Sequence, residues 1–248
     1  CEAIAVSKQV GKPIKLTWTR EDDVHHDYFR TGGFQKLKGA VDQNGKLAAW
    51  DQHVIGMERD GRAVSGAGFG AAEFPLLNLN TVRGSLSMLD IDTPCGPWRA
   101  PGANTHAFVV QGFIHELATL AKRDHLAFLL EMMGDPRWFK EGDIGSLNTG
   151  RAADVIRLAA KEAGWGRAMP AGRGLGLSFH FSHAAHVAEV AEVSMDSNRK
   201  LRLHKVTVAV DVGPIINRSG AIGQVQGSVI DGYSTMVGQL ITMENGQI

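Results

Sequence analysis

From residue 94 the sequence reads Pro94-Cys95-Gly96-Pro97-Trp98-Arg99-Ala100-Pro101-Gly102-Ala103-Asn104-Thr105-His106-Ala107-Phe108. Its prolines and glycines favour an irregular turn around Trp98 and Arg99, directly before a long helix. Unpaired N–H groups at a helix start and the positive end of the helix dipole attract anions, and the Arg99 guanidinium would add donors. The stretch therefore predicts an anion cradle. An ordinary junction between a loop and a helix explains the same residues, and this alternative stays open.

The helix after the loop is predicted from an apolar stripe. Its members recur at helical spacing and are Phe108, Val109, Phe113, Ile114, Leu117, Leu120 and Ala121. Four other segments are also predicted to be helical, and they are residues 2–10, 126–133, 151–163 and 220–236. In the last of these, Gly223, Gly227 and Gly232 recur every four or five residues. Such spacing lets a backbone or a bulky ligand approach the helix closely.

Alternation of apolar and polar residues predicts strands near both ends of the chain. The alternating segments are residues 14–19, 36–41, 46–50, 187–195 and 201–211. Turn residues at 42–45 and 196–199 join two pairs of them as hairpins, and the first third is predicted to be a meander. The turn-rich segment 170–176 predicts a boundary between two related halves, 1–169 and 170–248. The expected fold class is α+β, with mixed sheets and packed helices.

Composition excludes several broad classes of function. The 248 residues include 26 basic and 26 acidic side chains, so no excess charge indicates a nucleic-acid or anionic membrane partner. Apolar runs are far shorter than the roughly 20 residues of a bilayer-spanning helix. Cys1 and Cys95 are too few for a disulfide framework or a cysteine metal site.

Three groups of polar residues suggest chemistry, each with a simpler alternative. His180, His183 and His186 are spaced by three and could hold zinc, but in a strand His183 would point away from the other two. The cluster Glu21–Asp27 contains acid–base groups, and a solvated turn explains it as well.

A hydrolase triad is the third such group. Ser182, His186 and Asp211 supply the residue types, yet the chain has no G-x-S-x-G motif. The glycine-rich segment Gly66–Gly70 lacks the preceding strand of a dinucleotide site, so we expect a surface loop there.

The ends of the sequence suggest a piece of a longer polypeptide. The chain begins without methionine, inside a helical pattern. It ends just after Asn245-Gly246, a pair that normally turns one strand into the next.

Several motifs, in their order, resemble the large subunit of the molybdenum hydroxylases, the xanthine dehydrogenase and aldehyde oxidase family. The matching segments are Gly11–Asp23, Gly96–Gly102, Val210–Asn217 and Gly223–Gly227. Within that family, the motif Trp-Arg-Ala-Pro-Gly most resembles the one in the isoquinoline 1-oxidoreductase beta subunit and its membrane-associated aldehyde dehydrogenase relatives. The resemblance covers almost the whole chain.

The resemblance implies a cofactor and a reaction. Family members bind molybdopterin, often as the cytosine dinucleotide. They hydroxylate aldehydes or N-heteroaromatic compounds with oxygen from water and pass electrons to iron–sulfur clusters on a partner subunit. By motif match, the cofactor-binding residues would be Trp98, Arg99, Ala100, Gly102, Gln224, Gln226 and Gly227. Asp231 stands where better-known members have a pterin-contacting glutamine, and its charge would repel phosphates.

Two family elements are missing from these 248 residues. The glycine–phenylalanine loop would precede residue 1, and the catalytic glutamate, a general base, would follow residue 248. We therefore assign no catalytic or metal-ligating residue here. We expect the chain to be inactive without an iron–sulfur subunit and the remainder of its own polypeptide. A non-catalytic docking module and a serine hydrolase are the alternatives. The substrate and the location, bacterial cytoplasm or periplasm, stay open.

Overall fold

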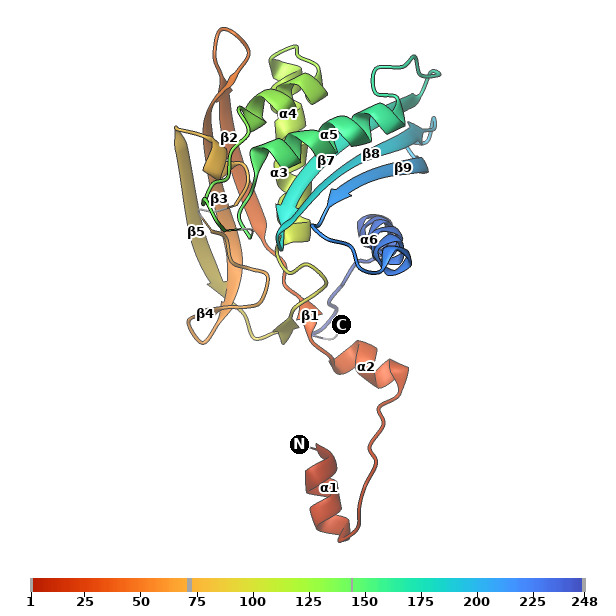
Figure 1. Cartoon of the computed structure of the whole chain (residues 1–248). Helices are drawn as coiled ribbons and strands as arrows, with labels where there is room; N and C mark the ends of the chain where they lie inside the picture. Colours follow the sequence, from red (N-terminus) through yellow and green to blue (C-terminus); the bar gives the residue numbers. More distant parts are fainter. Residues whose placement is uncertain (1, 71–72, 144, 247–248) are drawn as a thin grey trace.

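The computed structural model describes residues 2–70, 73–143 and 145–246, and it combines helices with several sheets (Figure 1). The helices are α1 (Glu2–Val10), α2 (Arg20–His26), α3 (Ala103–Leu120), α4 (His125–Met133), α5 (Thr149–Ala163) and α6 (Arg218–Val237), with a short 3₁₀ turn at Leu76–Asn78. The strands are β1 (Phe29–Arg30), β2 (Phe34–Val41), β3 (Leu47–Arg59), β4 (Arg62–Ala63), β5 (Val82–Asp90), β6 (Cys95–Gly96), β7 (Arg173–Ser182), β8 (Ala185–Met195) and β9 (Leu201–Asp211). The expected α+β class is confirmed. Within the described residues, no helix is long and apolar enough to cross a membrane.

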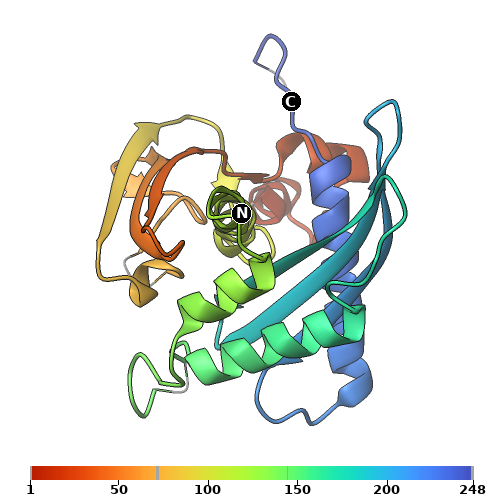
Figure 2. The ribbon, with the colours of Figure 1, turned by 90° about the horizontal axis from the view of Figure 1, so that it is seen from above.

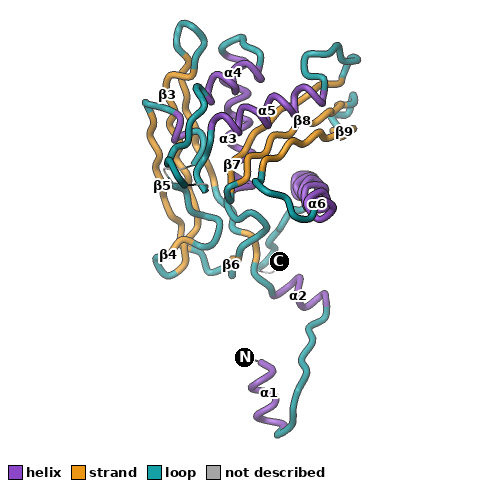
Figure 3. The backbone as a smooth tube through the Cα atoms, viewed as in Figure 1, coloured by secondary structure: helices purple, strands orange, loops and turns teal. Residues whose placement is uncertain are grey.

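The first sheet contains the predicted hairpin but is not a meander. β2 and β3 pair antiparallel, and Gly45 takes a left-handed φ of 74° in the turn between them. β5 then runs parallel to β3, with Trp50 opposite Val82, and β4 pairs with the end of β3 (Figure 3). The meander prediction is wrong at β5 because the chain crosses over before it rejoins the sheet, which local alternation cannot reveal.

The strand predicted at residues 14–19 is wrong. This segment is extended but has no strand partner in the described part of the chain, and its residues are mostly exposed. Alternation alone does not make a strand where no neighbouring strand offers hydrogen bonds. Thr19 instead caps α2, because its hydroxyl accepts a bond from the Asp22 N–H at 3.2 Å. Figure 1 shows α1, α2 and this connection as an arm that extends from the body.

The second sheet is the antiparallel set β7–β8–β9, with the predicted hairpin between β8 and β9. His183 and Ala184 turn β7 into β8 with φ values of 52° and 63°. Seen from above, α5 crosses one face of this sheet and α6 lies beneath the other (Figure 2). β7 begins at Arg173, so the segment predicted as a linker is shorter than expected. The division into halves at residue 170 stays a prediction.

The core joins both sheets through α3. Its largest buried side chains include Trp50, Ile114, Phe128, Ile156 and Phe179. The predicted apolar stripe of α3 is only partly right, because Phe108 is 73% exposed and Leu120 is 67% exposed. Other α3 residues are buried instead, namely His106, Val110, Gln111 and Ala118. Hydrophobicity alone predicts the stripe, whereas the buried face of α3 includes two polar side chains, His106 and Gln111.

Candidate cofactor-binding site

The loop before α3 is held at its start by a strand pair. β6 pairs parallel with β1, with Cys95 opposite Phe29. Gly96 is required there, because a Cβ at this position would lie 2.6 Å from the Cβ of Tyr28. Ala100 and Gly102 then take left-handed φ values of 53° and 74° and turn the chain into the helix.

The backbone N–H groups at the start of α3 already have partners. The Ala103 N–H donates to the Pro101 carbonyl at 2.9 Å, and the Thr105 and His106 N–H groups both donate to the Gly102 carbonyl at 3.0 Å. The Asn104 N–H has a longer bond to Ala100, at 3.4 Å. A cradle of free helix amides is therefore a wrong expectation, and any anion at this loop would rely on side chains.

Arg99 connects the loop to α6 across 125 residues of sequence. Its Nη2 donates to Gln224 Oε1 at 2.9 Å and to the Gln224 carbonyl at 3.3 Å. Gly227 lies one turn further along the same helix, where an added Cβ would be 3.7 Å from Arg99 Nη1. Three residues selected from the sequence, Arg99, Gln224 and Gly227, are thus brought together.

Trp98 and Arg99 stand between two cavities. The first, of about 520 Å³, lies between the start of α3 and α6, and it also has Ala100 in its wall. The second, of about 600 Å³ and more open, runs along α6 beside Gly227. Asp231 lines both cavities. One carboxylate and the Arg99 guanidinium therefore line the same cavities, and an anionic ligand would have to lie on the arginine side.

Arg30 is a second cation of this site, and the sequence analysis missed it. It lies on the two-residue strand β1 and lines the first cavity. Its Nη2 donates to the side chains of Asn104 and Thr105 at the start of α3, and burial lowers its pKa. No local motif marks this position, because only the β1–β6 pairing brings Arg30 to the loop.

Two of the seven selected residues lie outside this group. Gly102 is buried against the glycine-rich loop, where an added Cβ would be 3.4 Å from the Gly66 carbonyl oxygen. That loop is more than a surface loop, since Ala67 is 5% exposed and the Gly68 carbonyl accepts a bond from His106 Nε2 at 3.2 Å. Gln226 is exposed on α6 and lines neither cavity. Gly102 therefore supports the site through packing, and Gln226 stands apart from it.

The donor set fits a pterin with phosphate groups. Two guanidinium groups favour phosphate, and the hydroxyl of Ser228 suits the polar edge of a pterin ring. Gln224 lines neither cavity and contributes through its bond to Arg99. On α6, Gly227 and Gly232 contribute no side chain to the cavity walls, whereas Ile230 and Met236 add apolar surface to them. Asp231 is the one group in the set that opposes an anionic ligand.

The histidine and triad hypotheses are not supported by the geometry. Ser182 Oγ lies 2.6 Å from His183 Nδ1 rather than near His186. His186 Nε2 accepts the Asn148 N–H at 3.0 Å. Asp211 is held by Arg151 through two bonds of 2.6 and 2.5 Å, which lower its pKa to about 2. No group of three His, Cys, Asp or Glu residues suited to a metal occurs in the part of the chain that the structure describes.

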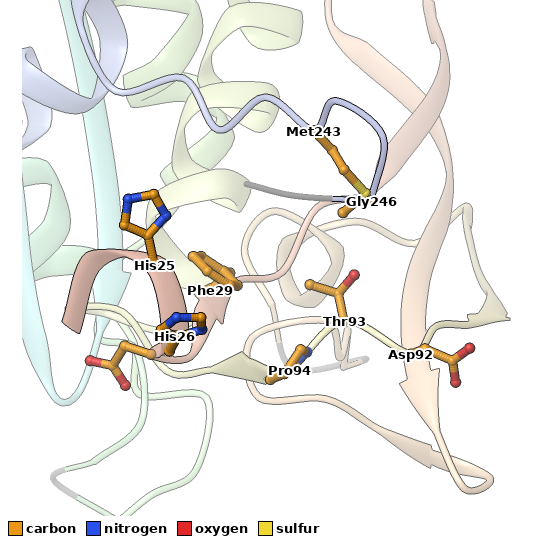
Figure 4. Close-up of a pocket in the computed structure, with 9 residues that line it drawn as sticks. His25, His26, Phe29, Asp92, Thr93, Pro94, Met243 and Gly246 are labelled. Atoms are coloured by element: carbon orange, nitrogen blue, oxygen red, sulfur yellow. The ribbon is translucent and has the colours of Figure 1, made fainter. Parts of the chain in front are cut away.

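The acidic cluster near α2 borders a separate cavity of about 640 Å³ (Figure 4). His25, His26 and Phe29 line it from one side, and Pro94 and Met243 come from two distant segments. His25 and His26 are exposed, and Asp22 is used in the α2 cap. The structure thus gives this cluster a surface position and a capping role.

Comparison with known proteins identifies the class of domain. Two sequence profiles, each described as a molybdopterin cofactor-binding domain, match residues 1–131 and 136–248. A membrane-bound aldehyde dehydrogenase (pyrroloquinoline-quinone) of Gluconacetobacter polyoxogenes is 25% identical over 98% of this chain and 34% of its own length. Isoquinoline 1-oxidoreductase subunit beta of Brevundimonas diminuta is 25% identical over 99% of this chain and 32% of its own length.

The fold is also found in a solved structure. CO dehydrogenase from Oligotropha carboxidovorans matches 80% of this chain and 29% of its own, with a TM-score of 0.53 at 14% identity. The chain spans about a third of the length of the two curated relatives described above. With profiles matched along nearly its full length, the chain belongs to the molybdopterin cofactor-binding domain family.

Proposed function

We propose that this chain forms the cofactor-binding part of a molybdenum-dependent oxidoreductase, with its site between the Trp98–Ala100 loop and α6. The observation that carries the proposal is the bond between Arg99 and Gln224, which joins two segments that match separate motifs of the family. Trp98, Ala100 and Gly227 complete the contact surface, and Gly102 and Gln226 are proposed as supporting positions.

The chain's own residues would bind and orient the group. Arg99 and Arg30 supply positive charge for phosphate, and the remaining amide hydrogens of Gln224 supply donors to a ring carbonyl. Trp98 offers an exposed aromatic face beside Arg99. When bound, the molybdenum cofactor supplies the two-electron redox chemistry.

The whole enzyme is proposed to act on an aldehyde or an N-heteroaromatic compound with oxygen from water. The named activities of the two curated relatives support this range of substrates. The cytosine dinucleotide form of the cofactor, iron–sulfur clusters on a partner subunit and a need for further polypeptide belong to the same proposal. The share of each relative that the chain spans supports the need for further polypeptide, and a relative that is itself a subunit supports the partner.

Molybdenum content tests the cofactor site directly. The chain is produced in a host that makes the cofactor, and molybdenum and phosphorus are measured per mole of purified protein. Arg99→Ala is expected to lower both by about tenfold, since a charge-assisted contact to phosphate contributes about 1.5–3 kcal/mol. Arg202→Ala is the matched control, because Arg202 is an exposed arginine on β9 away from the site. Equal loss in both variants, or wild-type protein without molybdenum, would contradict the proposal.

A docking role is the second candidate function, favoured by the exposed apolar side chains of α6. Ile222, Ile230 and Met236 are 48%, 69% and 53% exposed. An iron–sulfur subunit that is captured by the wild-type chain and lost with Ile230→Asp would support this role. Equal capture of the subunit by the wild-type chain and by Ile230→Asp would contradict this role.

A further inference from the structure

A fourth cavity, distinct from the two Arg99 cavities and from the one near α2, lies between α3 and the sheet face that α5 does not cover. Its volume is about 540 Å³, which falls in the usual range for small-molecule sites. α3 forms one wall, the first residue of α4 closes one end, and β7 and β8 form the other wall. The register pairs Ser178 with Glu189 and His180 with Val187, so Glu189 and His180 lie on the same face of this sheet. Figure 2 shows α3 beside the edge of that sheet.

Glycines keep the cavity open. An added Cβ at Gly112, Gly174 or Gly176 would meet no atom within 4 Å. Phe108, which is 73% exposed, lines both this cavity and the first Arg99 cavity. A flat apolar body could therefore lie over the glycines with its edge against the Phe108 ring.

Glu189 is the only acidic side chain among the residues that line this cavity, and lysine and arginine are absent from the same lining. It is half-buried, and no hydrogen bond or ion pair to it is found in the described part of the molecule. Burial raises its pKa, because the carboxylate loses hydration without gaining a partner. A cation placed beside it would restore the ionised form.

Neutral polar groups line the same cavity as this carboxyl. His125 and Gln111 are each only 6% exposed, and the atoms His125 Nε2 and Gln111 Nε2 have no partner among the described residues. Both ring nitrogens of His180 are in the same situation. Burial lowers the pKa of His125 and of His180 to about 4, so both imidazoles are uncharged near neutral pH. An uncharged imidazole offers one acceptor and does not repel a cation.

We propose that this cavity binds a small organic cation, namely a protonated amine attached to a flat apolar body. The ammonium group donates to the Glu189 carboxylate and to the free acceptor nitrogen of His180, while the apolar body covers the glycine floor. An acceptor atom on the ligand would satisfy Gln111 Nε2. The polar groups of this site are distinct from those of the Arg99 cavities, since Glu189, His180 and Gln111 line neither of them, and only Phe108 is shared with the first.

Three probes of nearly equal shape but different charge test the proposal: benzylammonium, benzyl alcohol and benzoate. Each is titrated by calorimetry into the 248-residue chain near neutral pH, with no molybdenum present. Benzylammonium is expected to bind at least about tenfold more tightly than benzyl alcohol, because a hydrogen bond to a charged group adds about 1.5–3 kcal/mol. Benzoate is expected to bind most weakly.

Two variants locate the binding. Glu189→Gln keeps the shape of the side chain and is expected to remove the preference for benzylammonium, whereas Glu162→Gln on the exposed surface of α5 should leave it unchanged. Gly176→Val adds bulk at a position where an added Cβ would meet no atom within 4 Å, and it should weaken all three probes, with the fold checked by circular dichroism. Equal binding of the three probes, binding of none, or full preference in Glu189→Gln would overturn the proposal.

Discussion

Helices α5 and α6 cover opposite faces of the same three-stranded sheet, yet they do so in different ways (Figure 2). α5 has seven buried residues among its fifteen, whereas α6, described along its full length, has none among its twenty. α5 presents alanines with Val155 and Ile156 to the strands. α6 carries Gly223, Gly227 and Gly232, and its isoleucines, Ile222 and Ile230, are 48% and 69% exposed.

The difference separates stability from ligand binding within one sheet. Burial of apolar side chains is the main source of folding free energy, so the α5 face holds the sheet in place. A helix with small residues and little burial leaves room beside it, and both Arg99 cavities lie along α6. We expect substitutions on the α5 side to change the free energy of unfolding and substitutions on the α6 side to change what the protein binds.

The largest expected effect is that of Ile156→Ala on α5. Ile156 is 0% exposed, and its truncation should lower the free energy of unfolding by about 2–5 kcal/mol through lost burial and a residual cavity. Ile230→Ala on α6 is the matched control, because Ile230 is 69% exposed, and it should change the value by less than about 0.5 kcal/mol. Urea denaturation followed by circular dichroism measures both. Similar losses for the two variants would break the contrast between the helices.

Acid is expected to weaken both faces of the sheet through buried imidazoles. Burial lowers the pKa of His186, on the α5 side, and of His180, on the opposite side, to about 4. An unfolded histidine has a pKa of about 6.5, so between that pH and pH 4 the unfolded state binds more protons, and stability falls as pH falls. Each group should contribute a loss on the order of 1–3 kcal/mol by pH 4.

Single substitutions separate the two contributions to the acid response. The free energy of unfolding is measured at several values of pH from 7 to 4 for the wild type, His180→Gln and His186→Gln. Each variant should show a smaller fall than the wild type, because one titrating group is gone. His204→Gln is a control, as His204 is a half-buried histidine of β9 bonded to Ser194. An unchanged pH response in both test variants would refute the role of these imidazoles.

The sequence predicted those parts of the fold that depend on local pattern. The α4, α5 and α6 helices and both hairpins were found because their periodicity, caps and turn residues lie within a short window. The error at residues 14–19 and the parallel placement of β5 depend on which strands become neighbours, and no local pattern contains that information.

The residues of the two cavity sites also differ in whether a local sequence pattern reveals them. Arg99 and Gln224 were found because each stands in a recognisable motif, and the structure adds the bond between them. Arg30 and Glu189 were missed, since each is an isolated charge on a strand whose importance comes only from the cavity it lines. The roles of all seven selected residues in cofactor binding stay a prediction.

A smaller effect on the free energy of unfolding is expected for two arginines that hydrogen-bond to distant segments, Arg151 on α5 and Arg99 beside α6. Arg151→Ala should lower the free energy of unfolding by about 1–2 kcal/mol, because the half-buried Asp211 loses two of its three hydrogen bonds and keeps only the one from the Gly213 N–H. Arg99→Ala removes two bonds to Gln224 on the exposed surface and should cost less than about 0.5 kcal/mol. Urea denaturation distinguishes the two values. A loss for Arg99→Ala as large as that for Arg151→Ala would make Arg99 a structural residue.

The smallest and most selective effect is expected at Gly227, where stability and binding should change in opposite directions. Replacing a helical glycine by alanine stabilises a helix by about 0.5–1 kcal/mol, and the new Cβ would lie at an ordinary contact distance of 3.7 Å from Arg99 Nη1. Gly223→Ala should give the same gain, because its Cβ would meet no atom within 4 Å. If the cofactor lies against Gly227, only Gly227→Ala should also reduce molybdenum content, since the methyl group occupies the space beside Arg99. Equal molybdenum content in the two variants would remove Gly227 from the site and leave the open face of α6 without a demonstrated ligand.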